Sequence, residues 1–409
     1  MFNLSSIIAV YRFWTILLIA YPGHCLRSNH IKNSNILSKL LLSLGGTAFG
    51  LIIALTAFII LIGDLRLLPT YIYDDTVVFR SGNGDILFWQ SEYIAPLENP
   101  EEILSVHRLR LDESGFRLPA NPSNGYRAIA LGDSYTEGAN VAIPWSDAFA
   151  NAGELSTRNL GFRGYGIRHY AWTWQEFGIQ ENPDVVIIGF FGGNDVYTAG
   201  LDISAPFPLP IEERANDLPA EPVTDQTLSD EVIYPIYLAD GTPITFLSTY
   251  ISWMNAAEDQ LTGSVNYRNI RDGLTQIRDS AADDTCLVFV YFPSKPEVYF
   301  PYLNDADYPA LLEGQKTVLI NSDGTLHIVE DFDINLERVM DWRLNTGNVM
   351  TGLADSLGYQ TLNLHTVFDE HATNGEMLYY TYDTHWNQAG QILAGETIAD
   401  FVLDNCENQ

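Results

Sequence analysis

Short apolar segments that follow turn-forming stretches constrain the fold of this chain most strongly. Most of them are rich in Val, Ile, Leu and Phe, and they show little alternation between apolar and polar residues. Strands that are buried on both faces have this character, which is typical of a parallel sheet covered by helices on each side. The segments are Ala128–Leu131, Thr157–Leu160, Val185–Phe191, Cys286–Phe292 and Gln360–Leu364.

Stretches with helical periodicity fit between these strands, at Ile167–Gln180, Tyr267–Ser280 and Ile334–Leu357. The alternation of strand and helix predicts a doubly wound, flavodoxin-like α/β domain with three α/β/α layers over residues 122–409. Two hairpin-like stretches, Ile236–Phe246 and Val318–Val329, interrupt the alternation. We interpret them as parts of insertions at about 200–250 and 313–332, near the ligand-binding end of the sheet.

A run of 24 residues without a charge, Leu40–Gly63, is long enough to cross a bilayer as a helix. A transmembrane helix over 40–63 is therefore predicted, in preference to a buried core helix or a cleaved signal peptide. No Asp or Glu occurs before Asp64, whereas Arg27, Lys32 and Lys39 precede the run. The positive-inside rule then makes 1–39 a cytoplasmic N-terminal segment and places everything after residue 63 outside the cytoplasm. A weak second span at 2–21 would leave this placement unchanged.

Composition excludes two broad classes of protein. Hydrophobic residues make up 46% of the chain, too many for an intrinsically disordered protein. The chain has 21 Lys and Arg against 52 Asp and Glu, a net charge of −31, which argues against binding to nucleic acid. Residues 64–121 are expected to form an irregular lead-in with a hairpin, in which Thr76–Arg80 and Asp85–Gln90 flank Ser-Gly-Asn-Gly.

A candidate nucleophile follows the first predicted strand of the domain, in the sequence Leu-Gly-Asp-Ser-Tyr-Thr-Glu-Gly at 131–138. Ser134 lies where a strand turns into a helix, at the carboxyl edge at which open α/β sheets bind ligands. Backbone N–H groups at the start of a helix are unpaired and stabilise developing negative charge. The alternative is that Asp133 and Ser134 only cap a helix, since both residue types are favoured caps.

The next two predicted strands end in small polar loops, at Asn159–Gly166 and at Gly192–Asp195. The ends of successive parallel strands lie side by side. A glycine exposes its backbone N–H and an asparagine offers a side-chain NH₂ group. Gly164 and Asn194 are therefore candidates to complete an oxyanion hole around Ser134, although each loop taken alone is an ordinary turn.

A candidate base stands near the C-terminus, in Tyr-Asp-Thr-His-Trp-Asn at 382–387. His385 can accept the serine proton and return it to a leaving group, while a nearby carboxylate orients the ring and stabilises the imidazolium. Asp383 is close enough along the chain to take that part. The other seven histidines have no comparable companion motif.

These four blocks, in this order, resemble the SGNH (GDSL-type) hydrolase superfamily over about Leu111–Val402. The resemblance implies Ser134 as nucleophile, Gly164 and Asn194 as oxyanion donors beside the N–H of Ser134, His385 as base and Asp383 as its partner. The segments Glu113–Arg117 and Pro293–Tyr299 also resemble bacterial members of the superfamily. Tyr135 replaces the more frequent Leu or Phe, a change that we expect to be tolerated.

One departure concerns the spacing of the C-terminal block. A single residue, Thr384, separates Asp383 from His385, whereas two residues are usual. The Asp-x-His-Trp pattern is similar to that of alginate and other exopolysaccharide O-acetyltransferases of the superfamily, in which the pair usually precedes the serine. A transferase that modifies a cell-surface polysaccharide is therefore the alternative to a hydrolase, and a catalytically inactive carbohydrate-binding or scaffold module is a second alternative.

Three further residues carry weaker predictions. Lys295 follows the fourth predicted strand, and we interpret it as a solvent-exposed loop lysine or a partner of Glu297, with contact to an anionic substrate as the alternative. Cys286 and Cys406 are not expected to be catalytic, and a disulfide between them is left open.

The sequence as a whole predicts a membrane-anchored serine esterase whose catalytic domain is extracytoplasmic. The expected substrate is an ester-bearing small molecule, lipid or glycan, and neither a metal nor an organic cofactor is required. The N-terminal helix would bind the membrane. A transferase would also need a membrane partner that delivers acyl groups.

Overall fold

A computed structural model provides the structure of the protein. It describes residues 105–199, 232–312, 335–381 and 383–406, short strands between residues 65 and 90 and between 317 and 329, and the single positions Gly46 and Gly50. Chain contacts divide the protein into two units, residues 1–63 and residues 64–409. The predicted span at 40–63 thus lies almost entirely outside the described residues. Among the residues that are described, no helix combines the length and apolar character needed to cross a membrane.

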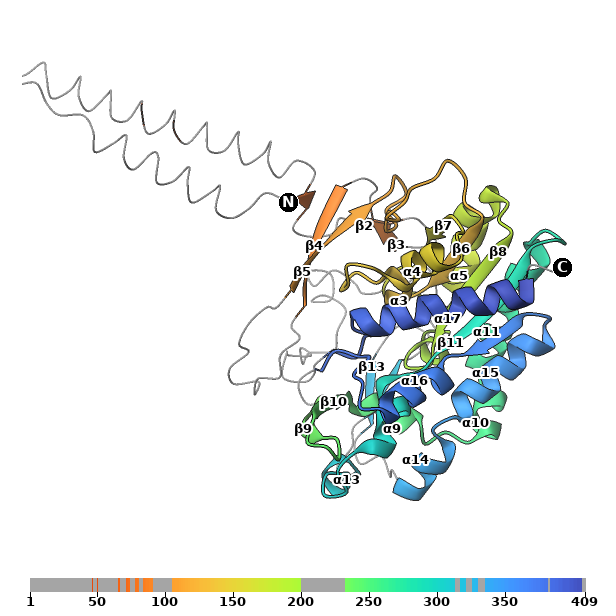
Figure 1. The fold of residues 1–409 in the computed structure, drawn as a ribbon. Helices are drawn as coiled ribbons and strands as arrows, with labels where there is room; N and C mark the ends of the chain where they lie inside the picture. The colour runs from red at the N-terminus through yellow and green to blue at the C-terminus, as the bar shows by residue number, and fades with distance from the viewer. Residues whose placement is uncertain are drawn as a thin grey trace, which may run out of the picture. The chain divides into compact units, whose positions relative to one another are not determined.

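The central sheet has five strands, all parallel, in the order β14-β11-β8-β6-β7 (Figure 1). This is the flavodoxin-like order, in which the direction of winding reverses between β6 and β8. Each strand coincides with a predicted apolar segment, so the prediction of a doubly wound parallel sheet is confirmed. The strands are β6 (Ala128–Gly132), β7 (Thr157–Asn159), β8 (Val185–Phe191), β11 (Cys286–Phe292) and β14 (Gln360–Asn363).

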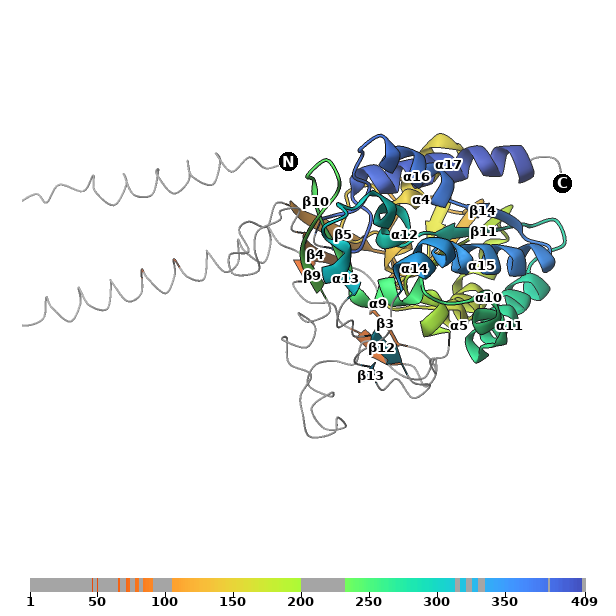
Figure 2. The ribbon, with the colours of Figure 1, turned by 90° about the horizontal axis from the view of Figure 1, so that it is seen from below.

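Helices cover both faces of this sheet (Figure 2). In β6, Ala128 and Ala130 belong to one hydrophobic cluster and Ile129 and Leu131 to another, because successive side chains of a strand point to opposite faces. The first cluster includes residues of α4 (Trp145–Ala152), α16 (His365–Thr373) and α17 (Gln388–Cys406). The second includes residues of α5 (Ile167–Thr173), α11 (Val265–Ser280) and α15 (Asn345–Ser356).

The predicted helices differ from the observed ones mainly in their ends. The stretch predicted at 167–180 is α5 followed by a π-helical turn, η1 (Trp174–Gly178), and a 3-10 turn, η2 (Ile179–Glu181). The single helix predicted at 334–357 is two helices, α14 (Leu336–Trp342) and α15. The remaining helical elements are α3 (Ser134–Glu137), α6 (Asp195–Thr198), α9 (Ser248–Trp253), α10 (Glu258–Gly263), α12 (Lys295–Tyr299), η3 (Phe300–Tyr302) and α13 (Tyr308–Leu312).

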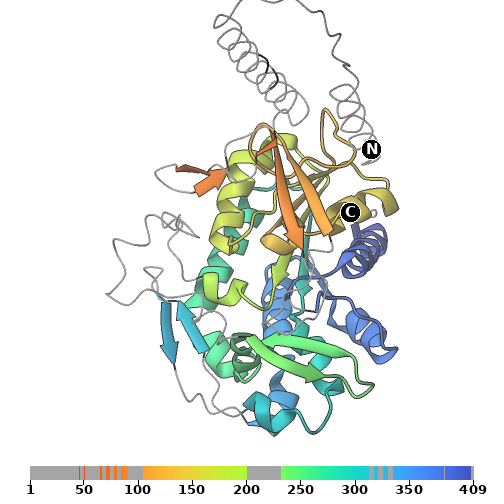
Figure 3. The same ribbon diagram turned by 90° about the vertical axis from the view of Figure 1, so that its left-hand side faces the viewer.

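Both hairpins predicted in the insertions are present (Figure 3). β9 (Val232–Tyr237) pairs with β10 (Pro243–Leu247), and β12 (Thr317–Ile320) pairs with β13 (Leu326–Val329), each antiparallel. In both cases an Asp-Gly pair lies between the two strands, and this pair favours the tight turns of hairpins.

The hairpin predicted in the lead-in is wrong, although its strands exist. β3 (Val78–Arg80) pairs with β2 (Tyr71–Tyr73), whereas β4 (Gly84–Gln90) pairs with β5 (Ser105–Leu111) and, in parallel, with β1 (Leu65–Arg66). The Ser-Gly-Asn-Gly sequence therefore stands between strands of two different sheets. A turn signal reverses the chain locally, but contacts more distant in sequence decide which strand becomes the partner.

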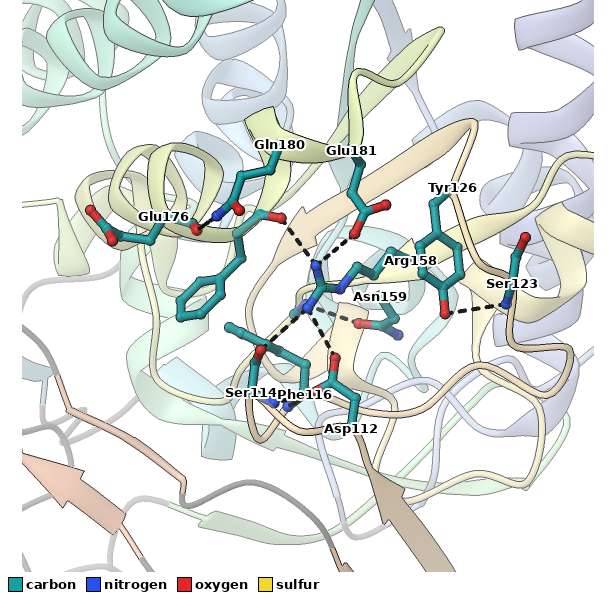
Figure 4. A network of polar contacts seen from close by, with 12 residues as sticks. Asp112, Ser114, Phe116, Ser123, Tyr126, Arg158, Asn159, Glu176, Gln180 and Glu181 are labelled. Atoms are coloured by element: carbon teal, nitrogen blue, oxygen red, sulfur yellow. Dashed lines mark hydrogen bonds and ion pairs between the residues drawn. The ribbon is translucent and has the colours of Figure 1, made fainter.

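The end of the lead-in is attached to the edge of the central sheet by Arg158 of β7 (Figure 4). Its guanidinium donates to Asp112 Oδ2 at 3.2 Å and to Glu181 Oε1 at 3.0 Å, and it also donates to the Phe177 carbonyl at 3.1 Å. Phe116 is buried and packs edge-on against Phe177. The contacts with Arg158 and Phe177 thus attach residues 112–116 to the β7 edge of the central sheet.

A disulfide joins Cys286, the first residue of β11, to Cys406, the last residue of α17. The two residues are 120 positions apart, and their Cα atoms are separated by 5.7 Å. The bond that the sequence left open therefore closes a large loop, which restricts the unfolded chain more than a small one.

Breaking this disulfide should destabilise the domain without displacing the catalytic groups. We expect Cys406→Ser to lower the free energy of unfolding by about 2–4 kcal/mol, because the unfolded chain regains conformational freedom. Urea unfolding with and without a reductant measures the loss, and Cys25→Ser is the control because Cys25 has no part in this bond. A Cys406→Ser variant as stable as the oxidised wild type would contradict the assignment.

Candidate active site

Ser134 lies at the carboxyl edge of the sheet because β6 ends at Gly132 and α3 begins at Ser134. Asp133 caps this short helix, since its Oδ1 accepts a hydrogen bond from the Tyr135 N–H at 2.9 Å. The capping alternative is thus correct for Asp133 but does not account for Ser134. Asp133 is fully buried, whereas Ser134 is partly exposed and open to a substrate.

A chain of hydrogen bonds links Ser134 to the C-terminal block. His385 Nε2 is 2.8 Å from Ser134 Oγ, and His385 Nδ1 is 2.5 Å from Asp383 Oδ1. The same Asp383 oxygen accepts a hydrogen bond from the His385 backbone N–H at 2.8 Å. The spacing of one residue between Asp383 and His385 therefore allows a carboxylate to hold the imidazole. The structure brings together all three residues that the sequence singled out as a triad.

Asp383 and His385 each favour the charged form of the other. Burial raises the pKa of Asp383, but the charge of His385 and hydrogen bonds from it lower that pKa by more, so that it lies well below its ordinary value. Burial lowers the pKa of His385, whereas the charge and hydrogen bond of Asp383 raise it, and the net pKa is above 6.5. An imidazole with a raised pKa is a stronger base, which suits the removal of a proton from a hydroxyl.

The two loops predicted to hold oxyanion donors leave the sheet beside Ser134. Gly132 of β6 pairs with Gly189 of β8, and its carbonyl accepts a hydrogen bond from the Phe162 N–H at 3.0 Å. Gly164 has φ of +76°, in the left-handed region that favours glycine. The side chain of Asn194 favours the ionised form of Asp133 and so lowers the pKa of that carboxyl. Gly164 and Asn194 are both partly exposed, as is Ser134.

Two buried carboxyl groups, those of Asp133 and Asp195, follow strands β6 and β8 near Ser134. Burial raises the pKa of Asp133 to about 6, although hydrogen bonds from Tyr135 and Asn194 and the charge of His385 oppose the rise. Burial, together with the charge of Asp133, raises the pKa of Asp195 well above its ordinary value. Asp195 accepts hydrogen bonds from the Phe191 N–H and the Tyr170 hydroxyl, each at 2.9 Å. These bonds fix the start of α6, directly after Asn194.

Two arginines that the sequence analysis did not single out as functional hold α3 in place. The guanidinium of Arg117 is buried and donates to the carbonyls of Gly138 and Ala142, which follow the helix. Arg163, the neighbour of Gly164, forms an ion pair with the buried Glu137 at 2.9 Å. Arg117 stood in the recognised Glu113–Arg117 segment, but its target could not be predicted from the sequence.

Tyr135 connects the nucleophile block directly to the base. Its hydroxyl donates to the carbonyl of Thr384 at 2.6 Å, and its ring lies 4.9 Å from that of His385. The ring is fully buried and also stacks on Phe191 at 3.9 Å. The expectation that Tyr135 is only a tolerated replacement for Leu or Phe misses this hydrogen bond, which neither of those residues could make.

Lys295 is not the solvent-exposed lysine that the sequence suggested. Its side chain is 1% exposed, and Nζ donates to the carbonyls of Tyr380 and Thr381, both at 2.9 Å. Nor does it pair with Glu297, whose carboxylate accepts from the Ser294 N–H at 2.6 Å and from the Tyr291 hydroxyl at 2.7 Å. A lysine after a strand gives no local sign of burial, so the sequence alone could not place it.

The described part of the chain contains no cluster of three or more His, Cys, Asp or Glu side chains arranged to hold a metal ion.

Comparisons with known proteins were made with both sequence and structure. No family model matches the chain, and no curated protein matches it. Solved structures do match, including a catalytic variant of an acetylxylan esterase from Geobacillus stearothermophilus, with 12% identity and a TM-score of 0.35 over 70% of this chain and 97% of that one. A protein described as a GDSL-like lipase, from Parabacteroides merdae, matches with 11% identity and a TM-score of 0.36 over 70% and 98%.

A lipolytic protein of the G-D-S-L family from Desulfitobacterium hafniense also matches, with 12% identity and a TM-score of 0.34 over 67% of this chain and 98% of that one. Two of these three proteins are thus described as GDSL-type and the third as an acetylxylan esterase. The chemistry assigned to this chain rests on the geometry of its own residues.

Removing the Tyr135 hydroxyl should loosen the base while leaving the core packed. We expect Tyr135→Phe to lower kcat for ester hydrolysis by roughly 10- to 100-fold, because a small displacement of catalytic groups is costly, and to leave KM nearly unchanged. Steady-state kinetics on p-nitrophenyl acetate measure the effect. Tyr170→Phe is the comparison, since its hydroxyl contacts Asp195 and not the His385 segment. An unchanged kcat in Tyr135→Phe would show that the bond to Thr384 is dispensable.

Proposed function

We propose that this protein is a serine-dependent ester hydrolase of the SGNH type. The observation that carries the proposal is the unbroken hydrogen-bonded chain from Ser134 Oγ through His385 to Asp383. A hydroxyl 2.8 Å from an imidazole whose far nitrogen is bonded to a carboxylate is the arrangement that activates a serine. Part of each of these residues is exposed, so the arrangement can meet a substrate.

The first half of the reaction forms an acyl-enzyme. Ser134 Oγ attacks the carbonyl carbon of the ester while its proton passes to His385 Nε2, and the carbonyl π electrons move onto oxygen. When the carbonyl reforms, the bond to the leaving alkoxide breaks, and His385 delivers the proton to that oxygen. Asp383 stays ionised and stabilises the imidazolium between the two transfers.

The negative charge that forms on the carbonyl oxygen needs donors aimed at it. The backbone N–H of Ser134, the N–H of Gly164 and the side-chain amide of Asn194 are the donors in this proposal. An amide NH₂ group has two hydrogens. In this proposal Asn194 donates one of them to the oxyanion. Each such donor contributes about 3–4 kcal/mol to transition-state stabilisation.

The second half of the reaction releases the acyl group. Water gives a proton to His385 and attacks the acyl carbon, the bond to Ser134 Oγ breaks, and the proton returns to the serine. An O-acetyltransferase would follow the same steps with a sugar hydroxyl in place of water. Nothing in the described geometry favours the sugar acceptor, so hydrolysis is the activity proposed.

Removing the nucleophile should abolish the activity. We expect Ser134→Ala to show no hydrolysis of p-nitrophenyl acetate above background and no labelling by a fluorophosphonate, which reacts only with an activated serine. Asn194→Ala should retain labelling but lose roughly 10²–10³-fold in kcat, because one oxyanion donor is gone. Wild-type protein that neither hydrolyses esters nor takes up the label would support the inactive-module alternative, and product recovered as an acetylated glycan would support the transferase.

We also propose that the catalytic domain lies outside the cytoplasm, anchored by a helix at 40–63. The uncharged run, the basic residues before it and the acidic chain after it support this orientation. The Cys286–Cys406 disulfide supports it independently, because such bonds persist in oxidising compartments and are rare in the cytosol.

Protease added to intact cells tests the orientation. We expect the chain after residue 64 to be digested while an epitope placed at the N-terminus survives, because the membrane would shield only the first 39 residues. Digestion of the N-terminal epitope with protection of the domain would reverse the proposed orientation.

A further inference from the structure

Lys295 is a buried cation that the proposed reaction does not use. It is the first residue of α12, directly after β11, and its side chain is 1% exposed. Burying an ammonium group is costly unless hydrogen bonds and opposite charge offset the loss of water. Hydrogen bonds and an opposite charge are both present at Lys295, next to Asp383 and His385. A role in packing alone therefore does not explain why a lysine is buried there.

The contacts of Lys295 are with the segment that carries the base and its partner. Nζ donates to the carbonyls of Tyr380 and Thr381, each at 2.9 Å, and Asp383 is two residues beyond Thr381. Thr245 of the β9–β10 hairpin also donates its hydroxyl to the Thr381 carbonyl. The segment has no regular secondary structure before α17, so its shape depends on donors from other elements.

Hydrogen bonds also hold the C-terminal end of this segment, at Thr384 and His385. The Tyr380 N–H donates to the His385 carbonyl at 3.0 Å, and Tyr135 donates to the Thr384 carbonyl. Lys295 is the charged member of this set of donors. Burial lowers the pKa of Lys295 to about 7, and the negative charge of Asp383 opposes this fall by favouring the ammonium form; Lys295 in turn favours the ionised form of Asp383.

We propose that Lys295 is a positioning residue of the hydrolase, whose ammonium group holds the 380–385 segment so that Asp383 stays bonded to His385 Nδ1. This role rests on the proposed function, because positioning matters for activity only if His385 is the base. An ammonium group suits the task since it has three donors and no acceptor, and can bind two carbonyls at once.

The charged groups that face His385 come from three places. Asp383 is on its own segment, Asp133 lies at the junction of β6 and α3, and Arg163 lies in the loop before α5. Asp383 and Asp133 raise the pKa of His385, whereas Arg163 lowers it. If Lys295→Met frees Asp383 from His385, the pKa of His385 must fall toward 6.5. If Asp383 stays in place, loss of a positive charge nearby must raise it. The sign of the shift thus separates positioning from a simple charge effect.

The titration of His385, followed by NMR of its ring nitrogens in the full-length chain, tests the proposal. We expect Lys295→Met to lower the pKa of His385 by on the order of half a pH unit or more. For p-nitrophenyl acetate we expect kcat to fall roughly 10²-fold, with KM within about threefold. The acid limb of kcat/KM, which requires neutral His385, should move to lower pH by the same amount.

Matched variants keep the test decisive. Tyr302→Phe removes hydroxyl contacts with Asp369 and Thr373, outside the 380–385 segment, and should leave the pKa of His385 unchanged. Lys295→Arg retains charge and donors and should keep the raised pKa, which serves as the test if Lys295→Met does not fold. A pKa of His385 that rises or stays constant in Lys295→Met, or that falls in Lys295→Arg, overturns the proposal.

The NMR readout does not require turnover. A His385 pKa that depends on Lys295 in a protein without esterase activity would reject the proposed function and keep the positioning role. Normal esterase activity, with a His385 pKa that does not change in Lys295→Met, would support the proposed function and reject the positioning role.

Discussion

The pairing of β6 with β8 is the constraint on which the site depends. Because the strands are parallel and Gly132 is in register with Gly189, the loops that follow them leave the sheet at the same edge. The hydrogen bond from Phe162 to Gly132 brings the loop after β7 to that edge too. Three segments separated along the chain therefore meet at one edge of the sheet. This edge is also where the strand order reverses, the place at which a doubly wound sheet leaves a crevice.

Strand register does not place His385, the candidate base, at that edge. Other contacts must therefore bring it there. Asp383 and His385 precede α17, which packs on the face of the sheet that also carries α4. Between α16 and α17 the chain is irregular, and buried donors from other elements fix its carbonyls. The bond from Tyr135 is notable because it begins at the residue after the nucleophile. The distance between Ser134 and His385 is thus set partly by the nucleophile block itself.

Much of the fold could be predicted because it depends on local composition. A strand that is buried on both faces must be apolar throughout, and for this reason β8 and β11 were predicted with their observed bounds. The residues of the triad could be predicted because each stands at a recognisable junction of strand, loop or helix. The predictions that were wrong depended on tertiary contacts. The turn after β3 was recognised, but the partner of β4 was β5, and no local feature of the chain indicates this. The burial of Lys295 could not be predicted for the same reason, since the carbonyls that its Nζ contacts belong to residues 85 and 86 positions away.

The proposed reaction creates negative charge on an acidic chain, and the carboxyl groups of the site differ in how they would affect it. Carboxylates near Ser134 would oppose an oxyanion if they were fully ionised and unscreened. Burial raises the pKa of Asp133 to about 6, which still leaves this group mainly ionised at neutral pH, and raises the pKa of Asp195 well above its ordinary value. Asp383, in contrast, is kept ionised on the far side of His385, where its charge stabilises the imidazolium. The pKa values of the two carboxyl groups thus shift in opposite directions. Burial dominates for Asp133, whereas the hydrogen bonds and charge of His385, together with the charge of Lys295, dominate for Asp383.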